Sequence, residues 1–339
     1  MNKLDPRNIY DDLHQIPELG FEEFKTSAYL ADKLESMGYK VTRNIGGTGV
    51  IGEIKGSEPG PVMMLRADMD ALPFLIDGEK KNIHACGHDA HSAMLLAAAS
   101  ELVGKVKRGT LRILFQQGEE TLKGALAVID AGVIEDVDIA LGLHIRPVQD
   151  IAYGEMSPAV RHASSTFVNV VINGLSSHGA RPHLGVNAIE AAAVAINAIT
   201  AIKINPIIPW SCKVTGIKGG GVAPNIIPDK VEMIVDARAQ TNEAMTELLE
   251  KLRRAVTNAA AALGATAEVT TPGGVIPAAE YDDELTAEVA ECIVEVVGEE
   301  KLAKELVNPG GEDFHYFVNK YPHICLLYTS PSPRDLSTS

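Results

Sequence analysis

The sequence predicts an α/β protein with a mostly parallel sheet flanked by helices and a second, inserted α+β domain. Apolar strand-like runs alternate with helix-like runs up to residue 145, a pattern typical of a parallel sheet covered on both faces. From residue 165 to residue 275 the order changes to β-α-β-β-α-β, the split βαβ plan of a small domain. A helix-like run at 282–298 belongs most simply to the first domain, so the second domain is an insertion.

The first domain is predicted to begin with one long helix over 10–39, where apolar residues recur at spacings of three and four. Alternating residues at 40–45 and 49–56 then predict a pair of strands. Polar residues close the later strand-like runs, which is where open α/β sheets place their sites. In chain order, these later elements are strand 61–73, helix 93–107, strand 109–120, helix 124–133 and strand 137–145.

The inserted domain and the chain end complete the predicted organisation. We expect the first domain at 1–164 and 276–325, the inserted domain at 165–275, and a separate tail at 326–339. The tail, LLYTSPSPRDLSTS, loses all periodicity and resembles translated adapter sequence, so we expect it to be non-native and the first domain to lack its C-terminal end. The inserted elements are strand 165–174, helix 187–202, strands 212–220 and 230–240, helix 243–264 and strand 266–274.

Composition excludes several classes of protein. A chain of 339 residues exceeds what one hydrophobic core usually holds. No apolar run approaches the roughly 20 residues of a membrane span, and the first residues show no apolar core of a secretory signal. A net charge of −15 argues against nucleic acid or an anionic membrane as partner. The few scattered cysteines predict reduced thiols in a cytoplasmic protein; they are Cys86, Cys212, Cys292 and Cys325.

The stretch NIHACGHDAH crowds three histidines, one cysteine and one aspartate into ten residues. Cys86 and His88 lie two residues apart in it, Glu119 and Glu120 end one buried strand, and His144 ends the next. These strand ends should converge on one cleft. A thiolate, imidazoles and a carboxylate fit Zn or Mn, with Co and Ni as further candidates, and they suffice for two ions if one ligand bridges. A structural zinc site would instead use four Cys or His in two close pairs, a pattern absent here.

The same residues have alternative explanations without catalysis. Cys86 could be a buried structural thiol, since free cysteine is among the most buried residue types. Glu119 and Glu120 could be solvated acids that favour a helix N-terminus. We expect His84 and His91 to lie at a helix start or to hydrogen-bond a metal ligand, rather than to bind metal themselves.

Two aspartates precede this stretch on the predicted strand 61–73. Asp68 and Asp70 alternate along it, so both should face the same way. We expect Asp70 to orient a metal ligand by a hydrogen bond. The alternative is a carboxylate that only caps the strand end.

Seven motifs occur in a fixed order: LRADMDALP, HACGHDAHSAMLLAAA, FQQGEE, GLHI, HGARPH, APNIIPD and GGEDF. Over about residues 5–322 this set resembles the M20 metallopeptidase family, specifically its amidohydrolase branch with the hippurate hydrolases and auxin-conjugate hydrolases. The resemblance implies a zinc-peptidase-like larger domain that binds two divalent ions per chain. It also implies that the inserted domain acts as a lid and as the dimerisation surface of a homodimer.

Residue roles in the larger domain follow from the resemblance, motif by motif. It implies that Glu119 is the general base, which takes a proton from the attacking water and passes it to the leaving amine. The implied metal ligands are Cys86, His88, Glu120 and His144.

In the inserted domain the resemblance implies a catalytic role for His178. This histidine would point across the dimer to the metal centre and help to stabilise the oxyanion. Asn225 and Arg238 would contact the carboxylate of the substrate, although Arg238 could instead be a salt-bridged strand residue. His183 is expected to be a structural donor near its loop.

The family supplies one further histidine ligand downstream of the GGEDF motif, and this chain reaches its tail before any matching segment. His315 and His323 are the remaining candidates, but neither matches the family position. For His315 the alternative is an imidazole on a helix surface. We therefore expect the last ligand to be missing from this sequence.

Three functions remain open at this stage. The first is a metal-dependent amidohydrolase for N-acyl amino acids, including aromatic-acyl ones, or for related small conjugates, with a dipeptidase or aminoacylase of the same family as its variant. The second is an amidase in which Cys86 is the nucleophile and a histidine its base, and chelation would leave this enzyme active. The third is a binding protein or an inert truncated homologue.

Overall fold

The computed structural model describes residues 3–318, 320 and 323–329, and these form two compact units. Unit 1 comprises Met1–Arg161, Glu280–Val307 and Glu312–Ser339, and unit 2 comprises His162–Ala279 and Asn308–Gly311. The units change at residues 161/162 and 279/280, where we expected 164/165 and 275/276. The short return of Asn308–Gly311 to unit 2 was not foreseen. It is held there because the N–H of Ala163 donates to the carbonyl of Asn308 at 2.9 Å.

Unit 1 is built on a six-stranded sheet in the order β1-β2-β6-β3-β7-β16. Strands β6, β3, β7 and β16 run parallel to one another, whereas β1 and β2 are antiparallel at one edge. The predicted mostly parallel sheet is thereby confirmed. The strands are β1 (Lys40–Ile45), β2 (Gly49–Lys55), β3 (Glu58–Asp68), β6 (Arg108–Gln116), β7 (Ile139–Ile145) and β16 (His323–Thr329).

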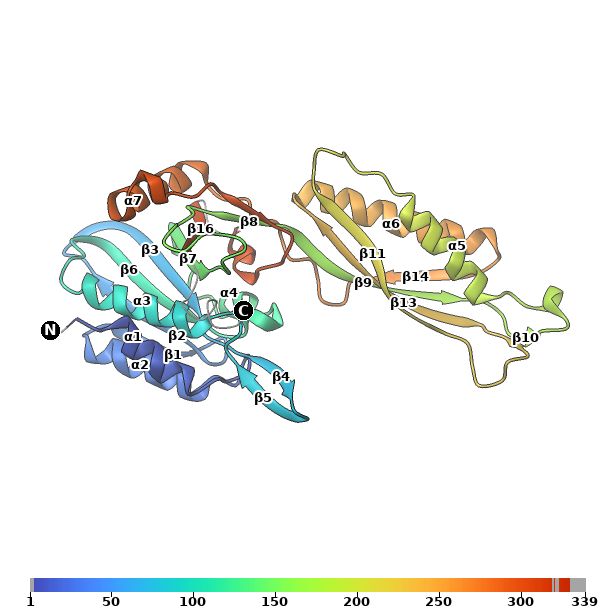
Figure 1. Cartoon of the computed structure of the whole chain (residues 1–339), viewed down its shortest axis with the longest axis horizontal. Coiled ribbons are helices and arrows are strands. Elements are labelled where there is room, and N and C mark those ends of the chain that lie inside the picture. The colour runs from blue at the N-terminus through green and yellow to red at the C-terminus, as the bar shows by residue number, and fades with distance from the viewer. Residues whose placement is uncertain (1–2, 319, 321–322, 330–339) are drawn as a thin grey trace. The chain divides into compact units, whose positions relative to one another are not determined.

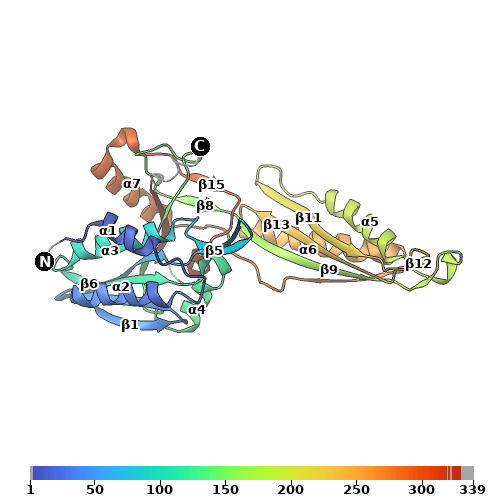
Figure 2. The same cartoon turned by 60° about the horizontal axis from the view of Figure 1, so that its bottom comes forward.

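Helices cover both faces of this sheet (Figures 1 and 2). One face carries α1 (Pro6–His14), α2 (Phe24–Ser36) and α3 (His88–Leu102), which form one core with alternate residues of β6 such as Ile113 and Phe115. Because side chains alternate across a strand, the residues between these point to the other face. That face meets α4 (Gly124–Asp130) and the short 3-10 helix η4 (Asp313–Phe317), and α7 (Asp283–Val297) contacts β16.

The single helix predicted over 10–39 is wrong, because the chain forms α1 and α2 with a break at 15–23. Pro17 lies in the break and has no N–H to continue a helix. Phe21 adopts a positive φ of 66°, which helical residues do not. Instead, the carbonyl of Glu18 accepts the N–H of Ala71 at 2.8 Å. The break therefore brings this segment to the C-terminal end of β3.

Unit 2 has a four-stranded antiparallel sheet in the order β11-β13-β9-β14, with both helices on one side (Figure 1). Its inward residues, such as Val168 and Val170, share one core with the alanine-rich faces of the helices. The predicted β-α-β-β-α-β order is confirmed. The elements are β9 (Ser164–Asn173), α5 (Ala188–Thr200), β11 (Trp210–Gly219), β13 (Lys230–Ala239), α6 (Asn242–Ala262) and β14 (Thr266–Thr270).

Smaller elements that periodicity did not predict complete the described part of the chain. An exposed hairpin of β4 (Leu72–Ile76) and β5 (Glu79–Ile83) connects β3 to the segment before α3. The other short strands are β8 (Val160–His162), β15 (Leu306–Asn308), β10 (Ser177–His178) and β12 (Ile226–Ile227). The other 3-10 turns are η1 (Glu119–Thr121), η2 (Pro182–Leu184) and η3 (Glu299–Lys301).

Strand β16 (His323–Thr329) includes the first four residues of the tail expected at 326–339. It pairs in parallel with β7 from His323 opposite Ile139 to Thr329 opposite Ile145. Regular pairing therefore continues past residue 325, the last residue expected in the first domain, and the rest of the expected tail, 330–339, lies outside the described residues. Among the helices that the structure describes, none is long and apolar enough to cross a membrane.

Candidate metal centre

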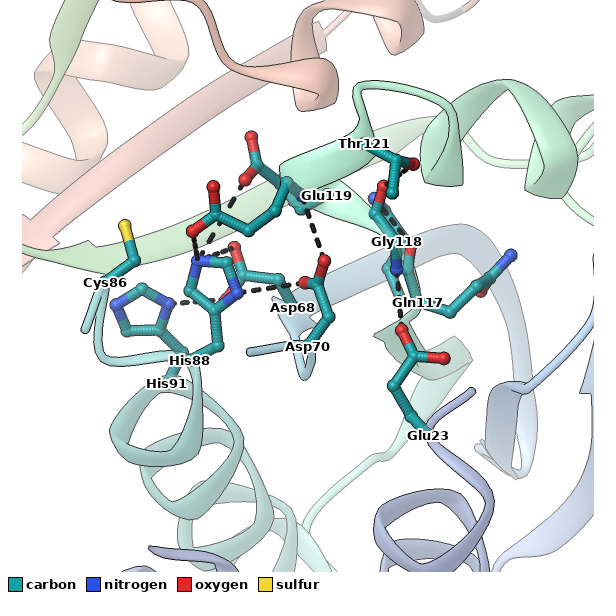
Figure 3. Close-up of polar contacts among 12 residues, drawn as sticks. Glu23, Asp68, Asp70, Cys86, His88, His91, Gln117, Gly118, Glu119 and Thr121 are labelled. Carbon is teal, nitrogen blue, oxygen red and sulfur yellow. Dashed lines mark hydrogen bonds and ion pairs between the residues drawn. The ribbon is translucent and has the colours of Figure 1, made fainter. Parts of the chain in front are cut away.

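The candidate site lies in unit 1 at the C-terminal ends of β3, β6 and β7 (Figure 3). Asp68 is the last residue of β3, η1 follows β6 and begins at Glu119, and His144 is the penultimate residue of β7. His88 is the first residue of α3, and Cys86 lies two residues before it. The structure thus brings together the residues that the strand ends predicted, at the edge where parallel sheets place their sites.

His88 is the central group of this site. It is fully buried, and its Nδ1 lies 3.0 Å from Oδ1 of Asp70. Its Nε2 is buried and has no hydrogen-bond partner among the described residues. That atom faces carboxylates at 3.8 Å (Asp68 Oδ2), 3.8 Å (Glu120 Oε1) and 4.0 Å (Glu119 Oε2). A buried ring nitrogen that makes no hydrogen bond to a described residue and has three carboxylates at 3.8–4.0 Å is the arrangement expected around a cation.

Among the described residues, His88 belongs to three groups of possible ligand atoms, one of which contains Asp68 and His91. Ligand atoms of Cys86, His88 and His144 lie within 4.8 Å of one another, and so do those of His88, Glu119 and Glu120. The sulfur of Cys86 is 3.5 Å from Nε2 of His144. Metal bonds to Cys, His and carboxylate ligands span about 2.0–2.3 Å, so these spacings suit ligands of a common ion. The residues therefore fit the two divalent ions that the sequence predicts.

Electrostatics favour a cation at this position. Burial, followed by the charges of Glu312 and Asp313, raises the pKa of Glu119 well above its usual value. Burial also raises the pKa of Glu120 and that of the Cys86 thiol. Carboxylates and a thiolate crowded together at a largely buried site repel one another. A divalent ion would offset that repulsion and stabilise their ionised forms.

Two glycines let the backbone place these groups. Gly87 has a φ of +86°, and a Cβ there would lie 2.3 Å from Cδ1 of Ile145. Gly118 has a φ of +61°, and a Cβ there would lie 2.6 Å from the ring of Phe21. Both positions combine a left-handed backbone with close packing, which only glycine tolerates. This explains the glycines of the ACGHD and QQGEE segments.

His91 and His84 are buried beside the ligand candidates. Nε2 of His91 accepts the N–H of Ile145 at 2.9 Å, so the neutral ring carries its hydrogen on Nδ1, which lies 2.5 Å from Asp68. Although His91 lies near enough to His88 to share an ion with it, both of its ring nitrogens are engaged. We therefore interpret His91 as a partner of the ligand set. Burial lowers the pKa of His84 and favours its neutral form.

Sequence reasoning missed a buried network behind the site. The guanidinium of Arg66 donates to Asp68 at 2.8 Å, to Glu312 at 3.1 Å and to Asp313 at 3.0 Å. Asp313 also accepts from Gln116 Nε2 at 2.8 Å. An arginine inside the apolar run PVMMLRADM was the available signal, because a buried cation requires anionic partners.

His315 is not the surface imidazole that its alternative explanation predicted. It is fully buried in η4, and its Nε2 lies 2.8 Å from the hydroxyl of Tyr281. The prediction of exposure was wrong because Asp313, which begins η4, is hydrogen-bonded to Arg66 of β3 and Gln116 of β6, so that η4 lies against buried residues of the sheet. His323 is exposed, with Nδ1 2.6 Å from Oδ2 of Asp282. Neither histidine belongs to a group of metal-ligating atoms among the described residues.

Of the site residues predicted in unit 2, His178 and Asn225 lie next to each other, whereas Arg238 has other partners. Asn225 Nδ2 lies 3.3 Å from Nε2 of His178, whose Nδ1 accepts the N–H of Ala180 at 3.1 Å. Arg238 instead lies on β13, where its Nε donates to Asp236 at 2.9 Å and its Nη1 to the carbonyl of Pro309 at 2.7 Å. This matches the salt-bridged strand residue considered as its alternative. His183 lies in η2.

This chain resembles proteins of a known peptidase family over most of its length. Residues 64–338 match the sequence model of the peptidase family M20/M25/M40. Thermostable carboxypeptidase 1 of Saccharolobus solfataricus is 35% identical over 325 residues, which cover 91% of this chain and 82% of that protein. N-acetyl-L-cysteine deacetylase of Bacillus subtilis is 33% identical over 341 residues, which cover 95% and 80% respectively.

A solved structure of similar fold is the Bacillus subtilis YXEP protein, described as a dinuclear metal binding peptidase from the M20 family. It superposes with a TM-score of 0.81 and 29% sequence identity, covering 96% of this chain and 88% of that one. The family match spans most of the sequence, and the curated relatives cover nearly all of it. The chain therefore belongs to the peptidase family M20/M25/M40.

Proposed function

We propose that this protein, a metallo-hydrolase of its family that acts on amide bonds, cleaves N-acyl amino acids or related small conjugates. One observation carries the proposal: the buried His88 belongs both to a group of possible ligand atoms with Cys86 and His144 and to one with Glu119 and Glu120. A thiol, two imidazoles and two adjacent carboxylates supply both metal ligands and a general base.

The names of the relatives support the substrate class. A carboxypeptidase and an N-acetyl-L-cysteine deacetylase both cleave an amide bond whose amine side is an amino acid with a free carboxylate. We propose that this chain recognises the same group, through Asn225 and Arg238. Arg238 is half-buried and paired with Asp236, so a substrate carboxylate would have to compete with that aspartate.

Within this proposal Glu119 moves the proton. When bound, divalent ions would lower the pKa of water and polarise the amide carbonyl. Glu119 would take the proton of the attacking water and deliver it to the leaving amine. Its carboxylate is held near the backbone, since the N–H of Asp313 lies 3.4 Å from Oε1. The raised pKa produced by burial and neighbouring carboxylates suits a group that must hold the proton between the two steps.

His178 and the assembly are further parts of the proposal. Nδ1 of His178 accepts a backbone N–H, so Nε2 is the nitrogen left to donate, which requires the Asn225 amide 3.3 Å away to present its oxygen to it. We propose that His178 donates to the developing oxyanion in the site of a second chain, within a homodimer formed through unit 2. A cytoplasmic location is supported by the free thiols of Cys86, Cys212 and Cys292.

The competing amidase with Cys86 as nucleophile has one observation in its favour, the 3.5 Å distance to His144. The direct test is to measure Mn, Zn, Co and Ni bound to the purified protein. Hydrolysis of N-acetyl-cysteine, hippurate and a dipeptide is then assayed with and without chelator. We expect bound metal and chelator-sensitive hydrolysis of the N-acyl amino acids. Activity that survives complete metal removal would identify the cysteine amidase, and preference for the dipeptide would identify a dipeptidase.

A further inference from the structure

Glu23 is a buried carboxylate that neither the ligand set nor the proposed proton transfer uses. Its side chain is fully buried, and it lies in the break between α1 and α2, directly before α2. As the N-cap residue of α2 it makes no side-chain bond to that helix. Figure 3 shows its carboxylate pointing to Gly118, which precedes Glu119.

The two oxygens of Glu23 connect three segments of unit 1. Oε1 accepts the N–H of Gly118 at 2.8 Å, and Oε2 accepts the hydroxyl of Thr48 at 2.5 Å. Thr48 lies in the turn between β1 and β2, and Gly118 lies between β6 and η1. Thr48 is buried as well, so neither donor could turn to solvent if the carboxylate were removed.

Gly118 begins the turn that carries both catalytic-site glutamates. Its carbonyl accepts the Thr121 hydroxyl at 2.7 Å and the N–H of Gly124 at 3.2 Å, which closes the turn. Two residues along, the N–H of Glu120 donates to Oδ2 of Asp70 at 3.0 Å. The turn is therefore held at one end by Glu23 and near its middle by Asp70.

We propose that Glu23 is a positioning residue: by binding the Gly118 N–H it fixes the turn that presents Glu119 and Glu120 to the metal centre. The roles of Glu119 and Glu120 rest on the proposed function, whereas the hold on the turn does not. Misplacement by an ångström of groups that must be aligned for reaction lowers turnover more than substrate binding.

Two substitutions at Glu23 separate geometry from charge. Glu23→Ala removes the acceptor of the Gly118 N–H. Glu23→Gln keeps a carbonyl oxygen for that N–H and offers its amide to the Thr48 hydroxyl. Burial raises the pKa of Glu23, so an uncharged side chain of the same shape suits the pocket.

Glu18→Ala is the matched control from the same segment. The Glu18 carboxylate accepts the N–H groups of Lys25 and Thr26 at 2.9 Å and the Thr26 hydroxyl at 3.0 Å. Removing it costs at least as many hydrogen bonds next to α2, while the Gly118 turn keeps its own. Any general loosening of this segment should therefore appear in both alanine variants.

The experiment measures hydrogen exchange of the 117–121 amides and steady-state kinetics of the metal-loaded 339-residue protein. In Glu23→Ala we expect exchange of these amides to rise at least about tenfold, kcat to fall about 10 to 100-fold, and KM to change less than about threefold. Glu23→Gln should restore most of both readouts, and Glu18→Ala should leave exchange at 117–121 unchanged.

Unchanged exchange at 117–121 in a folded Glu23→Ala protein would overturn the proposal, and so would an equal rise in Glu18→Ala. If the native protein hydrolyses no N-acyl amino acid, the proposed function fails, but the exchange comparison still decides whether Glu23 holds the turn. If exchange rises in Glu23→Ala but kcat of the active enzyme does not fall, the Glu23 carboxylate stabilises the turn without positioning Glu119 and Glu120 for reaction. In that case the inference is wrong.

Discussion

Nδ1 of His88 lies 3.0 Å from Oδ1 of Asp70, and the other oxygen of that carboxylate accepts the N–H of Glu120 at 3.0 Å. One buried aspartate thus orients an imidazole on α3 and the turn after β6. With its Nδ1 directed to Asp70, the ring of His88 presents Nε2 to the centre of the site. A carboxylate behind a ligating histidine fixes its tautomer and orientation and raises its basicity as a ligand.

Asp70→Ala should therefore weaken metal binding without unfolding the protein. Loss of such a partner typically costs about 10 to 100-fold in metal affinity or activity, and we expect that range in the dissociation constant measured by metal titration. Asp130→Ala, an exposed aspartate on α4, is the matched control and should bind metal as the native chain does. Native-like affinity in Asp70→Ala would show that His88 needs no such support.

Glu119 and Glu120 are adjacent, but we expect their substitution to impair different steps, proton transfer for Glu119 and metal binding for Glu120. Glu119→Gln should lower kcat by about 10²-fold or more, the range for general acid–base groups, and should retain metal. Glu120→Gln should lose metal affinity, and its activity should recover partly at high metal concentration. Parallel measurement of metal content and kcat tests both statements. Native rates in both variants would show that the base is another group.

The fold was largely predictable from the sequence because each long helix or strand buries one of its faces, and that burial produces a regular spacing of apolar residues. In unit 2, alternate residues of β9 and β13 and the alanine-rich faces of α5 and α6 meet in one core, and their periods of two and 3.6 are visible in the sequence. The long helix at 10–39 was misread because apolar spacing continues through the break. The interruption depends on Pro17 and on a bridge from Leu19 to Ala71, and the bridge partner is 52 residues away in the sequence.

The candidate site was predictable only where it follows strand ends. Glu119 and His144 stand where apolar runs give way to polar residues, so the converging strands of a parallel sheet were enough to group them, and Cys86 was added through its spacing of two residues from His88. Glu23 is hydrogen-bonded to Gly118, which is 95 residues away in the sequence, and Arg66 is hydrogen-bonded to Glu312, which is 246 residues away. No local pattern encodes such pairs, because each depends on how the segments pack.

Asp282 should stabilise α7 in a pH-dependent manner. Its side chain accepts the N–H of Leu285 at 2.7 Å as the N-cap of the helix. That hydrogen bond, followed by the one from His323, lowers the pKa of Asp282. A carboxylate whose pKa is lower in the folded than in the unfolded state stabilises the fold above its unfolded pKa, and this contribution is lost as pH falls through the folded pKa.

We therefore expect Asp282→Ala to reduce the free energy of unfolding by about 1 kcal/mol at neutral pH, the usual value of an N-cap. The difference from the native chain should shrink below about pH 4, where an aspartate of ordinary pKa becomes protonated. Asp282→Asn should retain most of the stability at all pH values, since asparagine is an equally good N-cap. Urea unfolding at several pH values measures these differences, and a pH-independent loss in Asp282→Ala would contradict the assignment.

His178 provides a test of whether two chains share each site. If His178 of one chain serves the metal centre of another, His178→Ala and Glu119→Gln are each poorly active, because every site in either homodimer lacks one group. A hybrid of the two variants contains one site with both Glu119 and His178 intact. Random pairing at equal amounts makes half the dimers hybrids, so co-expression should restore about a quarter of native activity.

The control for this complementation is the chain that carries both substitutions. Paired with His178→Ala, it offers His178 from neither chain, so co-expression should give no more activity than His178→Ala alone. Size-exclusion chromatography with light scattering establishes the oligomeric state of each mixture. A fully active monomer, or a co-expressed pair that gains nothing over its parents, would show that His178 acts within its own chain or takes no part in the reaction. Recovery near a quarter, absent from the control pair, would require that one chain supplies Glu119 and the other His178, because no other combination in the mixture contains both.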